Sequence, residues 1–493
     1  MILAIDQGTT NTKAVLVDRE GHARVRSSVR MDVRTLNSNW VEQDADAIWR
    51  SVISAVEACT RQAPHERIEG IAISNQRETV VAWERATGNP VAPAIVWQCC
   101  RSEAICEQLR RDGLDSMLRQ RTGLSIDTLF SASKMRWLLE NIPSLRARAE
   151  AGEICFGTVD SWLIWNLSGG QIHACDASNA SRTQLLNLST CAWDSELLKV
   201  FGVPLCSLPE IRNSAGVFAT CIALPTMSGV PIVSAMGDSH AALAGHGSYA
   251  PGTVKATYGT GSSLMSLLPQ LGSVGHEVAT TIAWKVGDTP QYALEGNIAM
   301  TGAAVAWVGS FLGLPRPIED SIALASSVES SEGVYLVPAM SGLGAPYWDG
   351  KASGTISGLT RTSRAAHLAR AAVESIAYQV HDVFEAMAKA AGCELTVLYA
   401  DGGATSNKAL MQFQADVLQR PVQPSGCEEL SALGAAWLGG IALGWWNSLA
   451  EVSSFAEHSS PYLPQRTSAE VALLLHGWRT AVARARLRDG AGA

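Results

Sequence analysis

Two stretches of this sequence, about 250 residues apart, share one layout. Residues 2–18 read ILAIDQGTTNTKAVLVD, and residues 252–268 read GTVKATYGTGSSLMSLL. Both predict two apolar β-strands joined by glycine and threonine, although a two-residue turn would be enough to close a hairpin. Glycine lets the backbone approach a ligand, and amide and hydroxyl donors suit phosphate oxygens. The repeat therefore favours two related domains, each with one hairpin that faces phosphate.

The size of the chain agrees with two domains. A chain of 493 residues is too long for one compact core. The restart of the pattern near residues 247–251 predicts domains at 1–247 and 248–493. Hydrophobic residues make up 47% and charged residues 17%, as in a globular enzyme and unlike a disordered chain.

Charge and cysteine content argue against several classes of protein. The net charge is −8 without a long basic run, so no nucleic acid is expected as a partner. The apolar start is too short for a signal peptide, and no apolar stretch reaches the roughly 18 residues of a membrane span. The 11 cysteines form no C-x-x-C pair, which disfavours structural zinc and a disulfide framework. A reduced, cytoplasmic setting is expected.

Strands and helices alternate along the chain, which predicts an α/β architecture. The predicted strands after the first hairpin include 68–74, 94–98, 231–236 and 395–400. The predicted helices include 44–59, with Asp44 as its cap, 365–391, 408–418 and a basic helix over 481–493. Ligands bind at the carboxyl ends of strands in such sheets, so the residues that follow these strands are candidates for a site.

The tip of the first hairpin places an acid beside hydrogen-bond donors. Asp6 offers a hard anionic oxygen for Mg²⁺ or its waters. Gly8, Thr9 and Thr10 offer amides and hydroxyls, and Lys13 adds positive charge. Taken alone, the stretch also fits an ordinary Asp-Gly loop capped by threonines.

Two other glycine-rich segments offer related chemistry. Gly259 and Thr260 lie in YGTG, and Gly402, Gly403 and Asn407 lie in DGGATSN. Paired glycines let a flat ligand lie against the backbone, and an asparagine amide can bond an edge such as that of adenine. A tight turn and a helix cap are the alternatives. Neither segment has the spacing of a Walker loop or of G-x-G-x-x-G.

Asp238 ends a predicted strand and begins a predicted helix. A helix N-terminus favours the ionised carboxylate, which a general base must have. In phosphoryl transfer the transition state is loose, so orienting the attacking hydroxyl matters most. The alternative for this residue is a simple N-cap.

Arg77 and Glu78 follow strand 68–74 in the segment SNQRET. Arginine donates to oxygens and glutamate accepts from hydroxyls, so this pair suits a polyhydroxy compound. Trp97 can give such a compound an apolar wall. A solvated surface pair and a core tryptophan are the alternatives.

Ten segments together resemble one family. They are AIDQGTT, WVEQDADAIW, ISNQRET, IVWQCCR, GTVDSWLIW, NASRT, YGTG, GVYLVPAMSGLGAPYWD, GLTR and ALGAAWL. From about residue 1 to about residue 445, in order and at compatible spacing, they resemble the FGGY carbohydrate kinases, and the glycerol kinases most of all. The resemblance implies an actin-like fold, with two ribonuclease H-like domains flanking a deep cleft that binds ATP and Mg²⁺.

The resemblance also implies roles for the candidate residues. It implies that Asp6 and Asp238 bind the metal. It implies that Arg77, Glu78, Trp97 and Asp238 face the substrate, with Asp238 as the base. The residues that it assigns to the nucleotide are Gly8, Thr9, Thr10, Lys13, Gly259, Thr260, Gly402, Gly403 and Asn407.

Three residues of the implied substrate pocket depart from the glycerol kinase pattern. Leu129 stands where those enzymes have tyrosine, Ser239 where they have glutamine, and Ser263 where they have phenylalanine. The segment ALPTMSGVP lacks the arginine of the loop that binds fructose 1,6-bisphosphate in bacterial glycerol kinases. A larger, more polar pocket predicts a four- or five-carbon polyol or ketose as substrate.

Other functions remain open at this point. One is a true glycerol kinase that makes glycerol 3-phosphate, and another is an actin- or chaperone-like ATPase without sugar transfer. SNQRET, Trp97 and Asp238 favour transfer, because hydrolysis alone needs no polyol pocket. An intact Asp6 and Asp238 weigh against a catalytically idle sugar sensor. A homodimer is the expected assembly.

Overall fold

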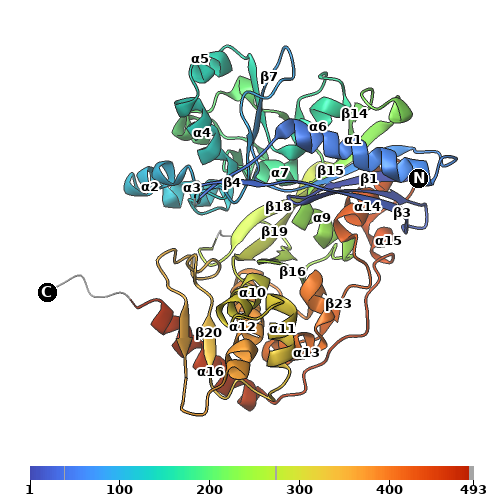
Figure 1. Cartoon of the computed structure of the whole chain (residues 1–493). Helices are drawn as coiled ribbons and strands as arrows, with labels where there is room; N and C mark the ends of the chain where they lie inside the picture. Colours follow the sequence, from blue (N-terminus) through green and yellow to red (C-terminus); the bar gives the residue numbers. More distant parts are fainter. Residues whose placement is uncertain (38, 273–274, 488–493) are drawn as a thin grey trace.

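Each of the two repeated hairpins belongs to a six-stranded mixed sheet, and each sheet is the centre of one body (Figure 1). The computed structural model describes residues 1–37, 39–272 and 275–487. No helix within these ranges is long and apolar enough to cross a membrane. The arrangement is the two-domain α/β fold that the sequence predicts.

The first sheet has the order β14-β15-β6-β1-β2-β3. Its strands are β1 (Ile2–Gln7), β2 (Asn11–Val17), β3 (Ala23–Arg30), β6 (Gly70–Asn75), β14 (Ala215–Thr220) and β15 (Pro231–Gly237). β1 and β15 both run parallel to β6, with Gln7 and Gly237 each in register with Asn75. The carboxyl ends of these three strands therefore meet at one edge of the sheet, where parallel strands place their ligands.

The second sheet repeats the plan with the order β18-β19-β17-β16-β22-β23. Its strands are β16 (Thr253–Tyr258), β17 (Ser262–Leu267), β18 (Ala279–Val286), β19 (Thr289–Ile298), β22 (Val397–Asp401) and β23 (Val422–Pro424). The hairpin β16–β17 is antiparallel, and β16 runs parallel to β22, as β1 does to β6. Thr257 and Asp401 are in register, so YGTG and DGGATSN begin side by side.

Helices cover the sheets of both bodies (Figure 1). The helices beside the two sheets are α1 (Ala45–Gln62), α6 (Val159–Leu167), α9 (Asp238–Gly245), α10 (Gly302–Phe311), α11 (Pro317–Ala325), α12 (Ala365–Ala390), α13 (Lys408–Leu418), α14 (Leu430–Ala442) and α16 (Ser468–Ala485). The first body also carries an outlying layer with α2 (Glu103–Arg111), α3 (Asp115–Thr122), α4 (Ser131–Asn141), α5 (Leu145–Glu150) and α8 (Ser195–Phe201), whereas α7 (Ala177–Ser181) lies between β15 of the first sheet and β18 of the second. Short strands in the same body include β4 (Arg34–Leu36), β5 (Trp40–Gln43), β7 (Val81–Glu84), β8 (Ala94–Ile95), β9 (Ile154–Gly157) and β10 (Ala174–Asp176).

Helix α14 comes late in the chain but packs against the first sheet. Trp437 and Leu438 of α14 share one buried cluster with Ile2, Val15 and Ala241. The indole nitrogen of Trp437 donates to the carbonyl oxygen of Gly21 at 3.0 Å. The core of the first body thus contains residues from both ends of the chain.

Several predicted elements have the expected bounds. Asp44 caps α1 by accepting from the amide of Asp46, and α12 closely matches the predicted helix 365–391. The predicted strand 94–98 is wrong beyond Ile95, because the amide of Trp97 donates to the Thr79 hydroxyl instead of to a strand. The predicted helix 481–493 is the end of α16, which begins at Ser468 behind a capping box. Residues 488–493 lie outside the described residues.

Candidate active site

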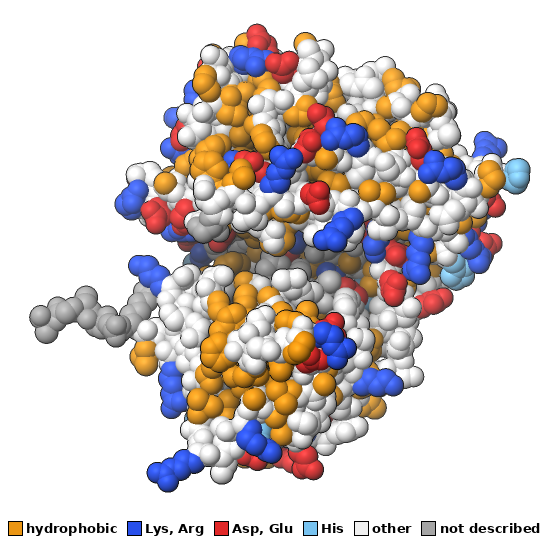
Figure 2. Space-filling model, in the orientation of Figure 1, with side chains coloured by type: hydrophobic (Ala, Val, Ile, Leu, Met, Phe, Trp, Pro, Cys, Tyr) orange, Lys and Arg blue, Asp and Glu red, His pale blue; other side chains and the backbone are white. Residues whose placement is uncertain are grey.

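A cavity of about 1000 Å³ lies where the two bodies meet. Asp6, Lys13, Asp238, Ser239, Gly402 and Gly403, all singled out from the sequence, line it. Thr257, Asp401 and Lys408 line it from the second body. Figure 2 shows the molecule hollowed between its two bodies. Candidate phosphate, base and nucleotide residues therefore share one space.

The tip of the first hairpin is held by hydrogen bonds. The Gly8 amide donates to the Asn11 carbonyl at 2.9 Å, and the Thr10 carbonyl accepts from the Met31 amide at 2.7 Å. The indole nitrogen of Trp97 donates to the Thr9 hydroxyl at 3.0 Å. A predicted nucleotide residue and a predicted substrate residue are thus in direct contact.

Asp6 is enclosed at the end of β1. Ser74 Oγ donates to Asp6 Oδ1 at 2.9 Å. Burial raises the pKa of Asp6 to about 6, and the negative charge of Asp238 acts in the same direction, whereas Ser74 and Lys13 oppose it. Two carboxylates in electrostatic contact at a polar cavity suit a divalent cation, which would relieve their repulsion.

Lys13 has a partner that the sequence did not reveal. Its Nζ lies 2.9 Å from Glu429 Oε2, at the start of α14. Burial lowers the pKa of Lys13, but the hydrogen bond and charge of Glu429 outweigh burial and raise it overall. Glu429 precedes the segment ALGAAWL by three residues, and no local pattern pairs it with a residue over 400 positions earlier.

Asp238 is the first residue of α9, and Gly237 is the N-cap. The Asp238 side chain is 39% exposed toward the cavity, and its Oδ1 accepts from the Ser239 amide at 2.6 Å. Arg77 Nε lies 3.2 Å from the same oxygen. The carboxylate is therefore oriented from two sides while one face remains open to a ligand.

Behind Asp238 runs a buried chain of alternating charges. Arg77 Nη1 lies 2.7 Å from Glu295 Oε1, Arg182 Nη1 lies 2.5 Å from Glu295 Oε2, and Arg182 Nε donates to Glu78 Oε1 at 2.7 Å. Although burial alone would raise it, the pKa of Glu295 is lowered to about 2 by Arg182 and Arg77. This chain links the predicted base to Glu78.

Glu78 has a backbone that side chains rarely adopt. Its φ is +59°, in the left-handed region, and its side chain is buried. Such strain persists only where the surroundings fix it, and it is frequent at ligand sites. Sequence reasoning selected Arg77 and Glu78 but missed Arg182 and Glu295. Arg182 lies in the quoted segment NASRT, which was a usable signal, whereas Glu295 lies in a strand of mixed polar and apolar residues, TPQYALEGNI, that matches no motif.

The three departures from the glycerol kinase pattern lie in different surroundings. Ser239 lines the cavity. Ser263 Oγ donates to Glu295 Oε1 at 3.4 Å, so it reaches the buried charge chain. Leu129 packs against the buried cluster formed by Leu124 and Phe130 of the first body and Ala279 of the second.

The glycine segments of the second body approach their neighbours very closely. Gly402 has a φ of +92°, and a Cβ there would lie 2.3 Å from the Tyr258 carbonyl oxygen. Gly403 would meet nothing within 4 Å, so its backbone is open to the cavity. The Gly259 amide donates to the Gly261 carbonyl, and the Thr260 carbonyl accepts from the Thr301 amide at 3.0 Å.

Asn407 acts as the N-cap of α13, where its side chain accepts from the Leu410 amide at 3.1 Å. This is the helix cap that the sequence left as the alternative. The side-chain nitrogen is not needed for that bond. Asn407 is not among the residues that line the cavity.

Two charged residues of the second sheet, Asp401 and Lys255, were also missed from the sequence. Asp401 Oδ2 lies 2.8 Å from His246 Nε2. Lys255 of β16 is fully buried, and within the described residues its Nζ has no hydrogen-bond partner. Burial lowers the pKa of Lys255, while Asp401 acts against this.

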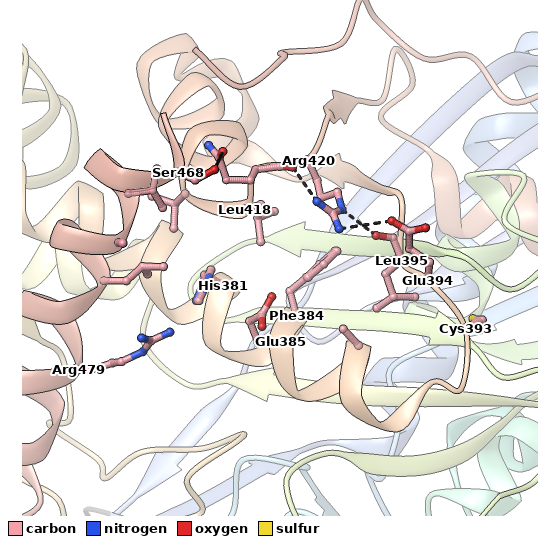
Figure 3. Close-up of a pocket in the computed structure, with 16 residues that line it drawn as sticks. His381, Phe384, Glu385, Cys393, Glu394, Leu395, Leu418, Arg420, Ser468 and Arg479 are labelled. Carbon is pink, nitrogen blue, oxygen red and sulfur yellow. Dashed lines mark hydrogen bonds and ion pairs between the residues drawn. The ribbon is translucent and has the colours of Figure 1, made fainter. Parts of the chain in front are cut away.

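A second cavity of about 470 Å³ lies far from these residues, among α12, α13 and α16 (Figure 3). Arg420 on its wall is held by Glu394 at 3.5 Å and by the Leu395 carbonyl. None of the predicted site residues lines it. It is therefore not the candidate active site.

Comparison with known proteins decides the family. The model of the N-terminal domain of the FGGY family of carbohydrate kinases matches residues 1–245, and that of the C-terminal domain matches residues 254–443. The chain belongs to the FGGY family of carbohydrate kinases. It is an ATP-dependent kinase of sugars or polyols, and the ATPase without sugar transfer is not supported.

Relatives of this FGGY kinase cover the whole chain. An apulose kinase of Pectobacterium atrosepticum is 46% identical over 100% of this chain and 99% of the relative. A glycerol kinase of Koribacter versatilis is 45% identical, with 98% of each chain covered. The crystal structure of Plasmodium falciparum glycerol kinase with ADP has a TM-score of 0.93 and 31% identity, and covers 99% of this chain and 98% of that chain.

Proposed function

We propose that this kinase transfers the γ-phosphoryl group of ATP to a terminal hydroxyl of a four- or five-carbon polyol or ketose. The observation that carries the proposal is the hydrogen bond of Ser263 to Glu295, at 3.4 Å. Where the glycerol kinase pattern puts a phenylalanine ring, a small hydroxyl side chain meets the charge chain, which leaves room and adds a polar group. The apulose kinase at 46% identity is a relative of matching length.

In this proposal Asp238 is the general base. Its carboxylate accepts the proton of the attacking hydroxyl, and Arg77 and the Ser239 amide hold it in position. Arg77, Glu78, Ser239 and Ser263 orient the other hydroxyls, and Trp97 and Leu129 form the apolar walls of the pocket. The buried chain fixes Arg77 and Glu78, so little side-chain entropy is lost when substrate binds.

The phosphates lie between the two hairpins in this proposal. Gly8, Thr9, Thr10 and Lys13 meet them from the first body, and Gly259 and Thr260 meet them from the second. Gly402, Gly403 and Asn407 hold the rest of the nucleotide, supported by the open backbone at Gly403.

Mg²⁺ is the proposed metal, and Asp6 and Asp238 would hold it directly or through water. The donor set fits, because Mg²⁺ is usually bound by one or two carboxylates plus waters and substrate phosphates. The raised pKa of Asp6, caused by burial and by Asp238, is further support, since a cation would stabilise both charges. When bound, the ion would neutralise charge on the β- and γ-phosphates.

A true glycerol kinase is the second candidate. It is favoured by the glycerol kinases at 42–45% identity, which match over at least 98% of this chain. The two candidates differ in the acceptor alone, because both need the same base and phosphate hairpins.

A series of acceptors decides between them. We would compare kcat/KM for glycerol, erythritol, threitol, erythrulose, xylitol, ribulose, xylulose and apulose at saturating ATP and Mg²⁺. Loss of one hydrogen bond to a buried hydroxyl costs about 1–3 kcal/mol, or about ten- to a hundredfold in affinity. A four- or five-carbon compound is expected to lead. If glycerol leads by about tenfold or more, the enlarged pocket is wrong and the enzyme is a glycerol kinase.

We also propose the domain roles, the location and the assembly expected from the sequence. Residues 1–247 would form the substrate and phosphate side, and residues 248–493 the nucleotide side. All eleven cysteines are free thiols, which supports a reducing, cytoplasmic setting. Phe311 and Ile318 are 63% and 46% exposed on α10 and α11, and a second copy in a homodimer could cover them. Sedimentation equilibrium tests the dimer.

A further inference from the structure

Lys134 occupies a position that is unfavourable for a cation. It is the fourth residue of α4, near the N-terminus, where the helix dipole repels positive charge. It is also fully buried, and burial lowers the pKa of Lys134 to about 8. A buried lysine in the first turns of a helix needs strong compensation to persist.

The compensation comes from three successive carbonyl groups. Lys134 Nζ donates to the carbonyl oxygens of Thr128, of Leu129 at 2.6 Å and of Phe130 at 3.3 Å. An ammonium group has three N–H donors, so each one has an acceptor. The backbone of residues 128–130 is therefore folded around this single charge.

The same segment connects the substrate side to the second body. Ser131 Oγ donates to the Glu78 carbonyl at 3.0 Å, and the Phe130 ring lies 5.0 Å from the Arg182 guanidinium. Leu129 packs against a buried cluster that includes Ala279 of the second body. A shift of the segment would move Leu129 and disturb the strained backbone of Glu78.

We propose that Lys134 is a positioning residue that holds segment 128–130 in place and so sets the size and selectivity of the acceptor pocket. It acts through Leu129 and Glu78 and does not itself touch the substrate. The inference rests on the proposed function, because it takes these two residues as part of the acceptor pocket.

The first test is Lys134→Met, which keeps a long side chain and removes all three donors. We expect KM for the best acceptor to rise about tenfold or more, with KM for ATP changed by less than about twofold, since acceptor binding alone is lost. Selectivity against the second-best acceptor should fall. Lys199→Met, on an exposed turn of α8, is the control and should leave both KM values unchanged.

A second variant covers the case in which Lys134→Met does not fold. Asp127 Oδ1 accepts from the Leu129 amide at 2.8 Å and holds the same segment from outside the helix. Asp127→Ala should raise the acceptor KM in the same selective way. Equal changes in the KM of acceptor and ATP, or an unchanged acceptor KM in whichever variant folds, would overturn the proposal.

A pH profile separates positioning from general stability. Charged groups facing Lys134 include Glu78 and Asp127, and the thiols of Cys99 and Cys106 are near. Burial raises the pKa of Cys106 to about 12, so that thiol stays neutral in the range tested. Above about pH 8 a neutral amine offers two N–H donors to three carbonyls, so the wild-type acceptor KM should rise while KM for ATP does not.

That rise should persist in Cys99→Ser and be absent from Lys134→Met. A rise of the same size in Lys134→Met would contradict the proposal, because it would come from another group. The acceptor in every assay is the compound with the highest kcat/KM, glycerol included. A lead for glycerol would refute the proposed substrate, whereas only the KM pattern of the variants decides the role of Lys134.

Discussion

Arg182 and Glu295 join the two bodies of the kinase through an ion pair without solvent contact. Arg182 follows α7 in the first body, Glu295 lies on β19 of the second, and Arg182 Nη1 is 2.5 Å from Glu295 Oε2. Both side chains are 0% exposed. The contact is ionic, since these two atoms do not have hydrogen-bond alignment. Arg77 from the first body takes the other oxygen of Glu295.

Removing the shared carboxylate should therefore destabilise the fold. Glu295→Gln leaves two buried guanidinium groups without their common counter-charge, and breaking a buried pair in this way costs about 3–5 kcal/mol. We expect a lower denaturant midpoint by both fluorescence and circular dichroism. Glu385→Gln, at an exposed position of α12, should change stability by less than about 0.5 kcal/mol. A Glu295→Gln midpoint as high as that of this control would show that the pair adds nothing.

Asp238→Asn should nearly abolish transfer and leave the fold intact. The amide cannot accept the proton of the substrate hydroxyl, and general-base contributions are about 10²–10⁴-fold. Single-turnover kinetics measures the loss, and binding of a non-hydrolysable ATP analogue should be retained. A variant that keeps more than about a third of the wild-type kcat would rule out Asp238 as the base.

Asp6→Asn should stabilise the enzyme at neutral pH in the absence of metal. Burial raises the pKa of Asp6 to about 6, so the folded state binds its proton more tightly than the unfolded chain does. Stability then falls as pH rises from about 4 to about 6, and the ionised group costs up to about 3 kcal/mol above that range. In thermal unfolding, the variant should have a higher Tm than the wild type at about pH 7.5, and this difference in Tm should be smaller at about pH 4.5.

The same variant should use Mg²⁺ poorly, with a higher Mg²⁺ requirement and little change in acceptor KM. Asp288→Asn, on an exposed turn between β18 and β19, is the control for both experiments. A gain in thermal stability of equal size at both pH values, or a Mg²⁺ dependence of activity equal to that of the wild type, would contradict this account of Asp6.

Restoring the glycerol kinase pattern should shift the acceptor preference. Ser263→Phe fills the space next to Glu295 and removes the 3.4 Å hydrogen bond. With Leu129→Tyr and Ser239→Gln added, kcat/KM for glycerol should rise and that for the longer acceptor should fall, by about tenfold each. KM for ATP serves as the internal control. A parallel loss for all acceptors would mean that the pocket was damaged and not resized.

The two bodies should close toward each other when both substrates bind. Asp6 and Lys13 of the first hairpin and Thr257 of the second line the cavity of about 1000 Å³. Transfer needs the hydroxyl aligned with the γ-phosphoryl group and water excluded. Small-angle scattering with acceptor and a non-hydrolysable nucleotide should show a smaller radius of gyration than the free enzyme. An unchanged radius would indicate a rigid cavity.

Much of the fold was predictable because local patterns coincide with the elements. The strands that end at Gln7, Asn75 and Gly237 are apolar runs followed by polar residues, and their parallel pairing places Asp6, Arg77 and Asp238 at one edge. The family motifs add the two-domain arrangement. Strand 94–98 was overestimated because a side-chain hydroxyl takes the amide of Trp97.

Partners distant in sequence could not be predicted. Glu429 forms an ion pair with Lys13, and Glu295 forms ion pairs with two arginines. The residues next to either glutamate in the sequence do not indicate these pairs. Lys134 was not selected from the sequence, because a lysine in a helix is ordinarily solvated. Only the three-dimensional contacts show that these charges are buried and shared.

The packing of α14 on the first sheet has a consequence for synthesis of the chain. The face of that sheet formed by Ile2 and Val15 is covered by Trp437 and Leu438. During synthesis on the ribosome, this apolar face stays uncovered until more than four hundred further residues have been made. The nascent first half is therefore a natural client for chaperones, and a fragment ending near residue 247 should aggregate unless the remainder is supplied in trans.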